Sequence, residues 1–248
     1  MRVAALYDIH GNLPALEAVL GDLRNADVNL IVIGGDVFPG PMASEALASL
    51  LDLDIPVQFI RGNGDREVLA LKAGTETGAV PERFRDAMRW NAEQLKPEHE
   101  RLMANWPPTF SVEIEGLGTV CFCHASPRDD TEIFTRLTPE DHLRPVFAGL
   151  DVPVIVCGHT HMQFDRTVGD VRVVNAGSVG MPFGEPGAYW LMLGADILLR
   201  HTGYDLANAA ERIRASDYPG ADEFALHNVL TPPSAEAALD AFARSSLE

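Results

Sequence analysis

The sequence predicts an α/β fold in which a largely parallel β-sheet packs against a second sheet. In its first half, short apolar runs alternate with helical patterns, which is the signature of βαβ units. Short apolar runs return after residue 106 and indicate the strands of the second sheet. The 248 residues, 46% of them hydrophobic, suffice for the core of a multilayered domain. Because there is no internal repeat, low-complexity linker or sharp break in composition, we expect a single domain over residues 1–248.

The first half of the chain contains three predicted strands and two predicted helices. The strands are the apolar runs Arg2–Tyr7, Leu30–Ile33 and Val57–Ile60. The helices are Leu13–Ala26, which has apolar residues at helical spacing, and Ser44–Leu53. Polar residues follow each strand, and ligands bind at the carboxyl edge of open parallel sheets. We therefore expect polar side chains from the three loops to converge at that edge.

The second half begins with a helical insertion, predicted over residues 66–106 and closed by Trp106-Pro107-Pro108. Four strands and a hairpin follow it: Phe110–Ile114, Thr119–His124, Val152–Cys157, Val171–Asn175 and the hairpin Tyr189–His201. The chain ends in a helical segment, residues 205–248, which is interrupted at Tyr218-Pro219-Gly220 and at Pro232-Pro233.

The charge of the chain limits its partners. Lys and Arg number 19 against 36 for Asp and Glu, so the formal net charge is −17. This balance opposes binding to duplex nucleic acid or to an anionic membrane, but it is compatible with a small substrate at a locally charged site. The sequence has no apolar run of the roughly 20 residues that span a bilayer, and its N-terminus becomes polar too early for a signal peptide. A cytoplasmic protein is expected.

The three cysteines are expected to be small buried residues of strand cores. Cys121 and Cys123 alternate within one apolar run, so both face the same side of a strand, and Cys157 ends another run. Their odd number argues against a disulfide framework. Zinc binding or redox chemistry is the alternative interpretation.

Five short clusters hold the ingredients of a metal site. They are Asp8-Ile9-His10, Gly35-Asp36, Gly62-Asn63-Gly64-Asp65, His124 and Gly158-His159-Thr160-His161. Each lies at the end of a predicted strand, and Gly11 and Gly158 permit the tight turns that bring paired side chains to one ion. Imidazole, carboxylate and amide ligands together suit Mn, Fe, Co, Ni or Zn better than calcium.

A single cluster of this kind is better explained as a turn cap or a hydrogen-bonded loop residue. All five clusters in this order favour a metal site instead. The remaining histidines are expected on the surface: His99, His142, His201 and His227.

This ordered set of motifs resembles that of the calcineurin-like metallophosphoesterase superfamily. The resemblance runs from Asp8 to His161 and extends weakly to Asn175-Ala176-Gly177-Ser178-Val179-Gly180, which is similar to the Asn-x-Gly-Ser turn of the small bacterial phosphodiesterases. The helical insertion and the C-terminal segment resemble the diadenosine-tetraphosphatase-related bacterial members only loosely. The resemblance implies a four-layer αββα sandwich of two mixed β-sheets flanked by helices, which agrees with the two groups of predicted strands.

The resemblance also implies two divalent metal ions per chain, with Mn as the first choice, and a metal-bridging hydroxide that attacks phosphorus in line. Asp36 would bridge the two ions. The implied ligands of one ion are Asp8, His10 and His161, and those of the other are Asn63, His124 and His159. The implied catalytic residues are Asp36, Asn63, Asp65 and His124. Two cations would make the pocket neutral or positive toward a phosphoester, whatever charge the outer surface carries.

One position departs from the family pattern. Many members have Gly-Asn-His-Asp or Gly-Asn-His-Glu where this chain has Gly62-Asn63-Gly64-Asp65, so the histidine that would help the leaving group or bind phosphate is absent. A general acid contributes about 10²–10⁴-fold, so we expect poor turnover of phosphomonoesters with alkoxide leaving groups. Strained cyclic phosphodiesters and acidic leaving groups would suffer less. Asp65 either holds the loop by hydrogen bonds or, with a raised pKa, supplies a proton.

Arg66 and Arg128 are the candidate substrate-binding residues, followed by Arg61, because a guanidinium group matches phosphate oxygens bidentately. Each of them could instead pair with a nearby carboxylate. Four aromatic residues near the motifs could stack a nucleobase or belong to the core: Tyr7, Phe38, Phe134 and Phe183.

The leading hypothesis is a di-metal phosphodiesterase that acts on small soluble phosphodiesters such as cyclic nucleotides or dinucleotides. A phosphomonoesterase or nucleotidase, or a dinucleoside polyphosphate hydrolase, with the same mechanism is the alternative. A non-catalytic scaffold on the same fold is the third hypothesis, but scaffolds of this kind lose ligand residues, and here all seven proposed ligands are present.

Overall fold

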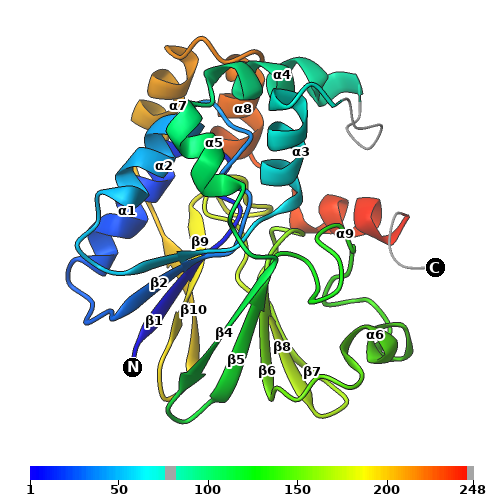
Figure 1. Cartoon of the computed structure of the whole chain (residues 1–248). Helices are drawn as coiled ribbons and strands as arrows, with labels where there is room; N and C mark the ends of the chain where they lie inside the picture. Colours follow the sequence, from blue (N-terminus) through cyan, green and yellow to red (C-terminus); the bar gives the residue numbers. More distant parts are fainter. Residues whose placement is uncertain (76–81, 245–248) are drawn as a thin grey trace.

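The computed structural model describes residues 1–75 and 82–244, and two five-stranded mixed sheets form its centre (Figure 1). The first sheet has the order β10-β9-β1-β2-β3, with strands Ile197–Thr202, Ala188–Leu193, Val3–Leu6, Leu30–Ile33 and Val57–Phe59. The second has the order β4-β5-β6-β8-β7, with strands Thr109–Ile114, Gly118–Cys123, Val154–Cys157, Val171–Asn175 and Phe164–Val168. The predicted pair of mixed sheets is confirmed.

Each sheet contains three neighbouring parallel strands. In the first sheet β1, β2 and β3 are parallel, as the predicted βαβ units require, and β9 pairs with β1 in the antiparallel direction. In the second sheet β5, β6 and β8 are parallel, while β4 and β7 are antiparallel edge strands. The predicted hairpin near residues 189–201 forms as β9 and β10, but it joins the first sheet rather than the second.

The helices connect these strands or cover the ends of the sheets. The crossover helices of the first sheet are α1 (Leu13–Leu23) and α2 (Ala43–Leu51). The predicted insertion holds α3 (Asn63–Lys72), a 3₁₀ turn (Glu82–Phe84), α4 (Arg85–Gln94) and α5 (Pro97–Met103), and its residues 76–81 lie outside the described residues. The later helices are α6 (Glu140–Phe147), α7 (Leu206–Arg214), α8 (Ala221–Phe224), a π-helical turn (Ala225–Leu230) and α9 (Ala235–Ala243). Residues 245–248 of the C-terminal segment also lie outside the described residues.

Successive side chains of a strand point to opposite faces of the sheet, and this alternation gives the molecule four layers. In β1, Ala4 and Leu6 face helices α1 and α2, whereas Val3 and Ala5 face the second sheet. Phe122 of β5 meets the first sheet from the other side. The outer face of the second sheet packs against α6 through three buried residues of that helix, Leu143, Val146 and Phe147. Helices, sheet, sheet and helix therefore follow one another, as the resemblance implied.

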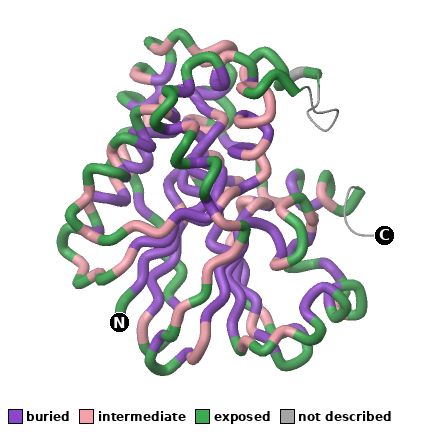
Figure 2. The backbone as a smooth tube through the Cα atoms, in the orientation of Figure 1, coloured by how far each residue is buried: buried purple, intermediate pink, exposed green. Residues whose placement is uncertain are grey.

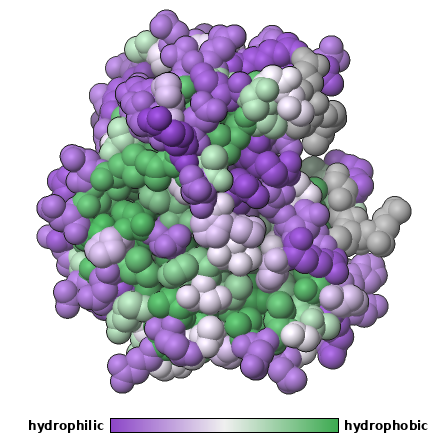
Figure 3. Space-filling model, viewed as in Figure 1, coloured by the Kyte–Doolittle hydropathy of each residue, from purple (hydrophilic) through white to green (hydrophobic). Residues whose placement is uncertain are grey.

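Burial and hydropathy follow this layering. Figure 2 shows the central strands as largely buried stretches and the outer turns of the helices as exposed. On the face seen in Figure 3, hydrophilic residues cover most of the helical part, and hydrophobic residues gather lower down, where the strands lie. None of the helices in the described part of the chain has the length and apolar character that crossing a bilayer requires.

Four differences from the sequence predictions have local causes. Helix α6 was not predicted because Pro145 lies inside it, and β7 was not predicted because only its two ends, Phe164 and Val168, are buried. Helix α3 begins at Asn63, three residues before the predicted insertion, and the carboxylate of Asp65 in its first turn accepts a hydrogen bond of 3.1 Å from the backbone N–H of Gly62, the residue before the helix. The prediction that His99 lies on the surface is wrong, because α5 packs it to 6% exposure.

Candidate metal centre

The polar clusters of the sequence meet at the carboxyl ends of five strands, β1, β2 and β3 of the first sheet and β5 and β6 of the second. Two of them, Asp8-Ile9-His10 and Gly35-Asp36, follow β1 and β2 of the first sheet, and Asn63 is the first residue of α3. His124 comes directly after β5, and His159 and His161 lie in the loop after β6. The site therefore lies between the two sheets and takes residues from both.

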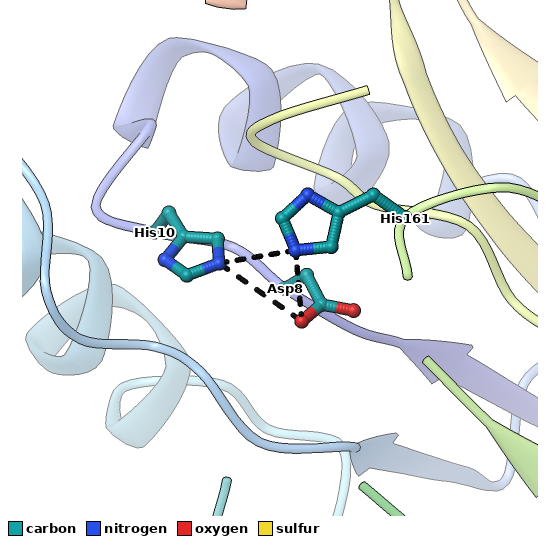
Figure 4. Close-up of side chains that lie close together, drawn as sticks. All are labelled: Asp8, His10 and His161. Atoms are coloured by element: carbon teal, nitrogen blue, oxygen red, sulfur yellow. Dashed lines mark hydrogen bonds and ion pairs between the residues drawn. The ribbon is translucent and has the colours of Figure 1, made fainter. Parts of the chain in front are cut away.

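One group of ligand atoms surrounds a carboxylate oxygen of Asp8 (Figure 4). Its Oδ1 atom lies 3.3 Å from Nε2 of His161 and 3.9 Å from Nε2 of His10. The two imidazole Nε2 atoms are 3.3 Å apart. Three potential ligand atoms from two loops thus lie close enough to share one ion.

A second group, Asp8, Asp36 and His124, lies next to the first and shares Asp8 with it. Nε2 of His124 lies 3.8 Å from Oδ1 of Asp8 and 3.6 Å from Oδ2 of Asp36. The same Oδ2 atom lies 3.6 Å from Nε2 of His10. Asp36 is therefore between the two groups, which is where the resemblance implied a bridging carboxylate.

Asn63 brings His159 into the second group. One end of its side-chain amide lies 3.0 Å from Nε2 of His124, 3.0 Å from Nδ1 of His159 and 3.2 Å from the carbonyl oxygen of Asp130. Its other end lies 3.2 Å from the backbone N–H of Gly64. Acceptor atoms thus converge on one point, and a divalent cation there would satisfy an amide oxygen and two imidazole nitrogens at once.

Backbone carbonyl groups orient three of the imidazoles. Nδ1 of His10 lies 3.2 Å from the carbonyl oxygen of Pro39, Nδ1 of His124 lies 2.9 Å from that of Gly34, and Nδ1 of His161 lies 2.8 Å from that of Met181. A carbonyl oxygen only accepts, so we assign the proton of each ring to Nδ1. This tautomer leaves the Nε2 lone pair of each ring facing the site, as histidine ligands of metals require.

The pKa values of the buried carboxylates and imidazoles indicate a site that favours a bound cation. Burial lowers the pKa of His10, and burial together with His124 lowers that of His159 to about 4. Burial opposes ionisation of Asp8, but the imidazoles of His161, His124 and His10 hold its pKa well below the usual value. Burial likewise opposes charge on His124 and His161, yet Asp36 and Asp8 raise the pKa of these two imidazoles. Divalent cations would neutralise the negative charge of the carboxylates without requiring any ligand to be protonated.

Asp8 provides a direct test of whether these residues fit a metal. Its side chain is fully buried, and its Oδ2 atom accepts a hydrogen bond of 2.9 Å from the backbone N–H of His159. Its Oδ1 atom has no hydrogen-bond partner. A buried carboxylate oxygen without a partner is costly, and a cation among Asp8, His10 and His161 would remove that cost. The donor set and this orphaned oxygen both fit a metal ion.

The backbone is strained at the same residues. In the described part of the chain, the non-glycine residues with positive φ are Asp8 (52°), His10 (46°), Asp36 (53°), His159 (64°) and His161 (57°). Each of them is a candidate ligand. Residues in this region cost on the order of 1–3 kcal/mol and persist where the surroundings impose them, commonly at functional sites. The strain therefore marks the same site that the side chains mark.

The turn after β8 holds two of the ligand loops in place, although the sequence assigned it no role. Asn175 donates from Nδ2 to the carbonyl oxygen of Gly158 at 2.6 Å and accepts at Oδ1 from the N–H of Gly177 at 2.8 Å. Ser178 donates from Oγ to the carbonyl oxygen of Asp8 at 2.7 Å. Both side chains are buried, and the signal available in the sequence was the Asn-x-Gly-Ser motif to which the resemblance extends.

Asp65 is fully buried behind the ligands, and its contacts favour the loop-holding alternative. Its two oxygens accept hydrogen bonds from the backbone N–H groups of Asp36 (2.8 Å), Phe38 (3.0 Å) and Gly62 (3.1 Å). Burial and the charge of Asp36 raise the pKa of Asp65 to about 7, while the N–H donors favour the carboxylate form. Asp65 thus fixes the loop of Asp36 relative to α3.

The two arginines predicted to bind substrate, Arg66 and Arg128, form ion pairs in this structure. The guanidinium group of Arg66 contacts both oxygens of Asp130 at 2.8 and 2.9 Å and Glu67 at 2.7 Å. Arg128 donates to Glu132 at 2.6 Å. By contrast, Nε of Arg61 is buried and has no hydrogen-bond partner. Of the three arginines near the motifs, Arg61 is the one whose guanidinium group makes no ion pair with the described residues.

The aromatic candidates separate into two kinds. Tyr7, Phe38 and Phe134 are buried, as a core role requires. Phe183 is half-buried, and its ring stacks on that of His161 with 5.9 Å between centroids. The three cysteines are free and buried, in agreement with the sequence prediction.

A family model described as the calcineurin-like phosphoesterase superfamily domain matches residues 1–196. An uncharacterized protein of Methanocaldococcus jannaschii is 30% identical over 199 residues, which are 73% of this chain and 76% of that protein. The fold is similar to that of a hypothetical protein from Pyrococcus horikoshii, with a TM-score of 0.76, 22% identity and coverage of 94% of this chain and 99% of that one. It is also similar to that of a metallophosphoesterase from Sphaerobacter thermophilus, with a TM-score of 0.70, 24% identity and coverage of 93% and 98%.

Proposed function

The chain belongs to the calcineurin-like phosphoesterase superfamily, and on that premise we propose that it is a phosphodiesterase that works with two divalent metal ions. Its substrates would be small soluble phosphodiesters, of which cyclic nucleotides and dinucleotides are examples. The observation that carries the proposal is the convergence of seven candidate ligands, five of them held in the left-handed backbone region. The ligands are Asp8, His10, Asp36, Asn63, His124, His159 and His161.

Each part of the site would have a separate task. Asp8, His10 and His161 would hold one ion, Asn63, His124 and His159 the other, and Asp36 would contact both. Bound divalent ions supply an activated water and neutralise charge on the phosphate oxygens. Manganese remains our first choice for the metal, and a cytosolic location and a small phosphoester partner remain part of the proposal.

Gly64 supports the preference for diesters. Its N–H donates to Oδ1 of Asp36 at 2.8 Å. A Cβ atom on Gly64 would lie 2.5 Å from the carbonyl oxygen of Phe38 and 2.9 Å from Cδ of Pro39. The carbonyl group of Phe38 and the ring of Pro39 therefore fill the space that a side chain at position 64 would need. Without an acid at this position, diesters with acidic leaving groups or ring strain are the substrates that the site would hydrolyse best.

The test is hydrolysis by metal-stripped protein reloaded with Mn or Ni, with bis-p-nitrophenyl phosphate and p-nitrophenyl phosphate assayed in parallel. We expect a higher kcat/KM for the diester. A higher kcat/KM for the monoester would contradict the diesterase assignment while keeping the metal-dependent mechanism. No hydrolysis of either substrate by protein that carries two ions would contradict both and favour the scaffold hypothesis.

A further inference from the structure

We propose that Phe183 and Phe242 form an aromatic subsite beside the metal centre, which binds a ring on the ester group that remains on phosphorus. The inference rests on the proposed phosphodiesterase function and names its substrate class. That class is phosphodiesters in which this ester group is an aryl group or a nucleoside.

The first ring of the subsite lies against a candidate ligand. The rings of Phe183 and His161 are stacked, with 5.9 Å between centroids and 29° between planes. The side chain of Phe183 is half-buried, so part of the ring remains accessible. The other aromatic candidates near the motifs, Tyr7, Phe38 and Phe134, are at most 2% exposed and cannot contact a ligand. Phe183 is therefore the aromatic residue placed to meet a substrate at this site.

The second ring comes from the C-terminal helix. Phe242 of α9 is also half-buried and meets Phe183 edge to face, with 5.8 Å between centroids and 81° between planes. The two rings thus form a corner with apolar surfaces at right angles. A ring that enters this corner can stack on one phenylalanine and meet the other edge-on, which are the two favoured geometries of aromatic pairs.

Packing fixes this corner next to the metal centre. Ala238 and Leu239 of α9 pack with Met162, the residue after His161. The backbone N–H of Gly184 donates to the carbonyl oxygen of Pro233 at 2.9 Å, which ties the loop of Phe183 to the segment before α9. In Figure 1, α9 extends from the region where the strands of both sheets end. The corner is thus part of the fold rather than a chance contact of two surface side chains.

The chemistry of the corner selects an aromatic group. It is apolar, and stacking on a phenylalanine ring accepts any base or aryl ring, since each has a π-face. A phosphate held at the ions near His161 would place its ester groups beside Phe183. The family model ends at residue 196, so Phe242 belongs to a part of the chain that this model does not cover. The subsite would therefore give this chain a substrate preference of its own.

Three diesters that share p-nitrophenolate as the leaving group test the proposal. They are methyl p-nitrophenyl phosphate, bis-p-nitrophenyl phosphate and thymidine 5′-p-nitrophenyl phosphate. In each reaction water adds to phosphorus as the P–O bond to p-nitrophenolate breaks, so differences report only the remaining ester group. For Phe183→Leu and Phe242→Leu we expect kcat/KM to fall about 5-fold for the two ring-bearing substrates and to stay unchanged for the methyl diester. The two ring-bearing substrates distinguish an aryl from a nucleoside preference. Phe84→Leu, at an exposed phenylalanine in the insertion, is the matched control and should change nothing.

Equal losses for all three substrates would overturn the subsite, because the rings would then act only by supporting His161. Unchanged values for the ring-bearing substrates would overturn it as well. If the metal-loaded wild type hydrolyses none of the three, the proposed function fails, and binding then decides the subsite. Calorimetric titration of the metal-loaded protein with thymidine 5′-monophosphate and with methyl phosphate should show an approximately 5-fold weaker affinity of Phe242→Leu for the nucleotide alone. An unchanged nucleotide affinity would overturn the subsite in that case too.

Discussion

Ser178 donates a hydrogen bond from its hydroxyl group to the backbone carbonyl oxygen of Asp8, 2.7 Å away. The N–H of Gly180 donates to the same oxygen at 3.0 Å. Two donors from the loop after β8 therefore fix the peptide of a residue whose φ angle of 52° lies in the left-handed region. Asp8 is held in its strained conformation by a partner 170 residues away in the sequence.

We expect Ser178→Ala to weaken metal binding about 10- to 100-fold, because Ser178 positions the Asp8 loop without touching the ion. The free energy of unfolding should fall by about 1–3 kcal/mol, because Gly180 still satisfies the Asp8 oxygen but the backbone N–H of Met181 loses its acceptor, the hydroxyl oxygen of Ser178. Isothermal titration with Mn and thermal unfolding measure the two effects. Ser216→Ala, which removes a similar bond of 2.6 Å to Ile213 in α7, is the control and should leave metal affinity unchanged. Equal metal affinity of the two variants would show that Ser178 does not position Asp8.

Gly64→Ala should destabilise the protein and lower its metal affinity, because the added Cβ would lie 2.5 Å from the carbonyl oxygen of Phe38 and 3.1 Å from Oδ1 of Asp36. For the same reason, Gly64→His should not create phosphomonoesterase activity. Gly21→Ala is the matched control: nothing lies within 4 Å of its Cβ position in α1, so a gain in stability is expected. Thermal unfolding of the two alanine variants gives the comparison. A stable Gly64→His variant with raised kcat/KM for p-nitrophenyl phosphate would show that the position can accommodate an acid.

Arg61→Met is expected to raise the KM for the diester about 10-fold, because the guanidinium group of Arg61 makes no ion pair with the described residues and lies just before the loop of Asn63. Arg66→Met should instead lower the midpoint of thermal unfolding, because it breaks the bidentate contact with Asp130. Steady-state kinetics and thermal unfolding of both variants separate the two roles. A larger rise in KM for Arg66→Met than for Arg61→Met would favour Arg66 over Arg61 as the substrate-binding residue.

His124→Ala should reduce the metal content from two ions to one or fewer per chain, because Nε2 of His124 lies within 3.0 to 3.8 Å of Asn63, Asp36 and Asp8. Elemental analysis of dialysed protein measures the content independently of activity. His142→Ala, at an exposed histidine of α6, should bind as much metal as the wild type. Retention of two ions by His124→Ala would remove it from the set of ligands.

Chelation should lower the midpoint of thermal unfolding, and reloading should restore it. Ions that bind only the folded chain stabilise it by RT ln(1 + [L]/Kd), which is about 2.7 kcal/mol at a free concentration of 100 Kd. Thermal unfolding with Mn added stepwise to stripped protein gives the dependence. A midpoint that does not respond to the metal would mean that the carboxylates and imidazoles bind no ion at these concentrations.

The sequence could predict the parts of this fold that repeat a pattern. Alternation of apolar runs and helices identified β1, β2 and β3, and the motifs identified the residues that now lie within a few ångströms of each other. The residue types alone show which atoms of the candidate ligands could bind a metal ion. Their convergence follows from the common direction of the parallel strands.

Other features depend on partners that no local pattern reveals. Whether Arg66 binds substrate or pairs with Asp130 depends on a contact 64 residues away. Whether Phe183 belongs to the core or is available to stack on a ligand depends on its contact with α9. The role of Ser178 depends on its contact with the loop of Asp8. The loss of space at Gly64 comes from the path of residues 38–39. Tertiary contacts decide the role of each of these residues, and such contacts cannot be inferred from the local pattern of a single sequence.

The division of the ligands between the two sheets sets the order in which the site can come into existence during synthesis. Asp8, Asp36 and Asn63 emerge from the ribosome early, but His159 and His161 come after β6, and Ser178 comes later still. A nascent chain that ends before β6 presents the other candidate ligands without His159 and His161. The proposed site would therefore be complete only when the second sheet has docked on the first, and an ion bound there would link the early and late parts of the newly made chain.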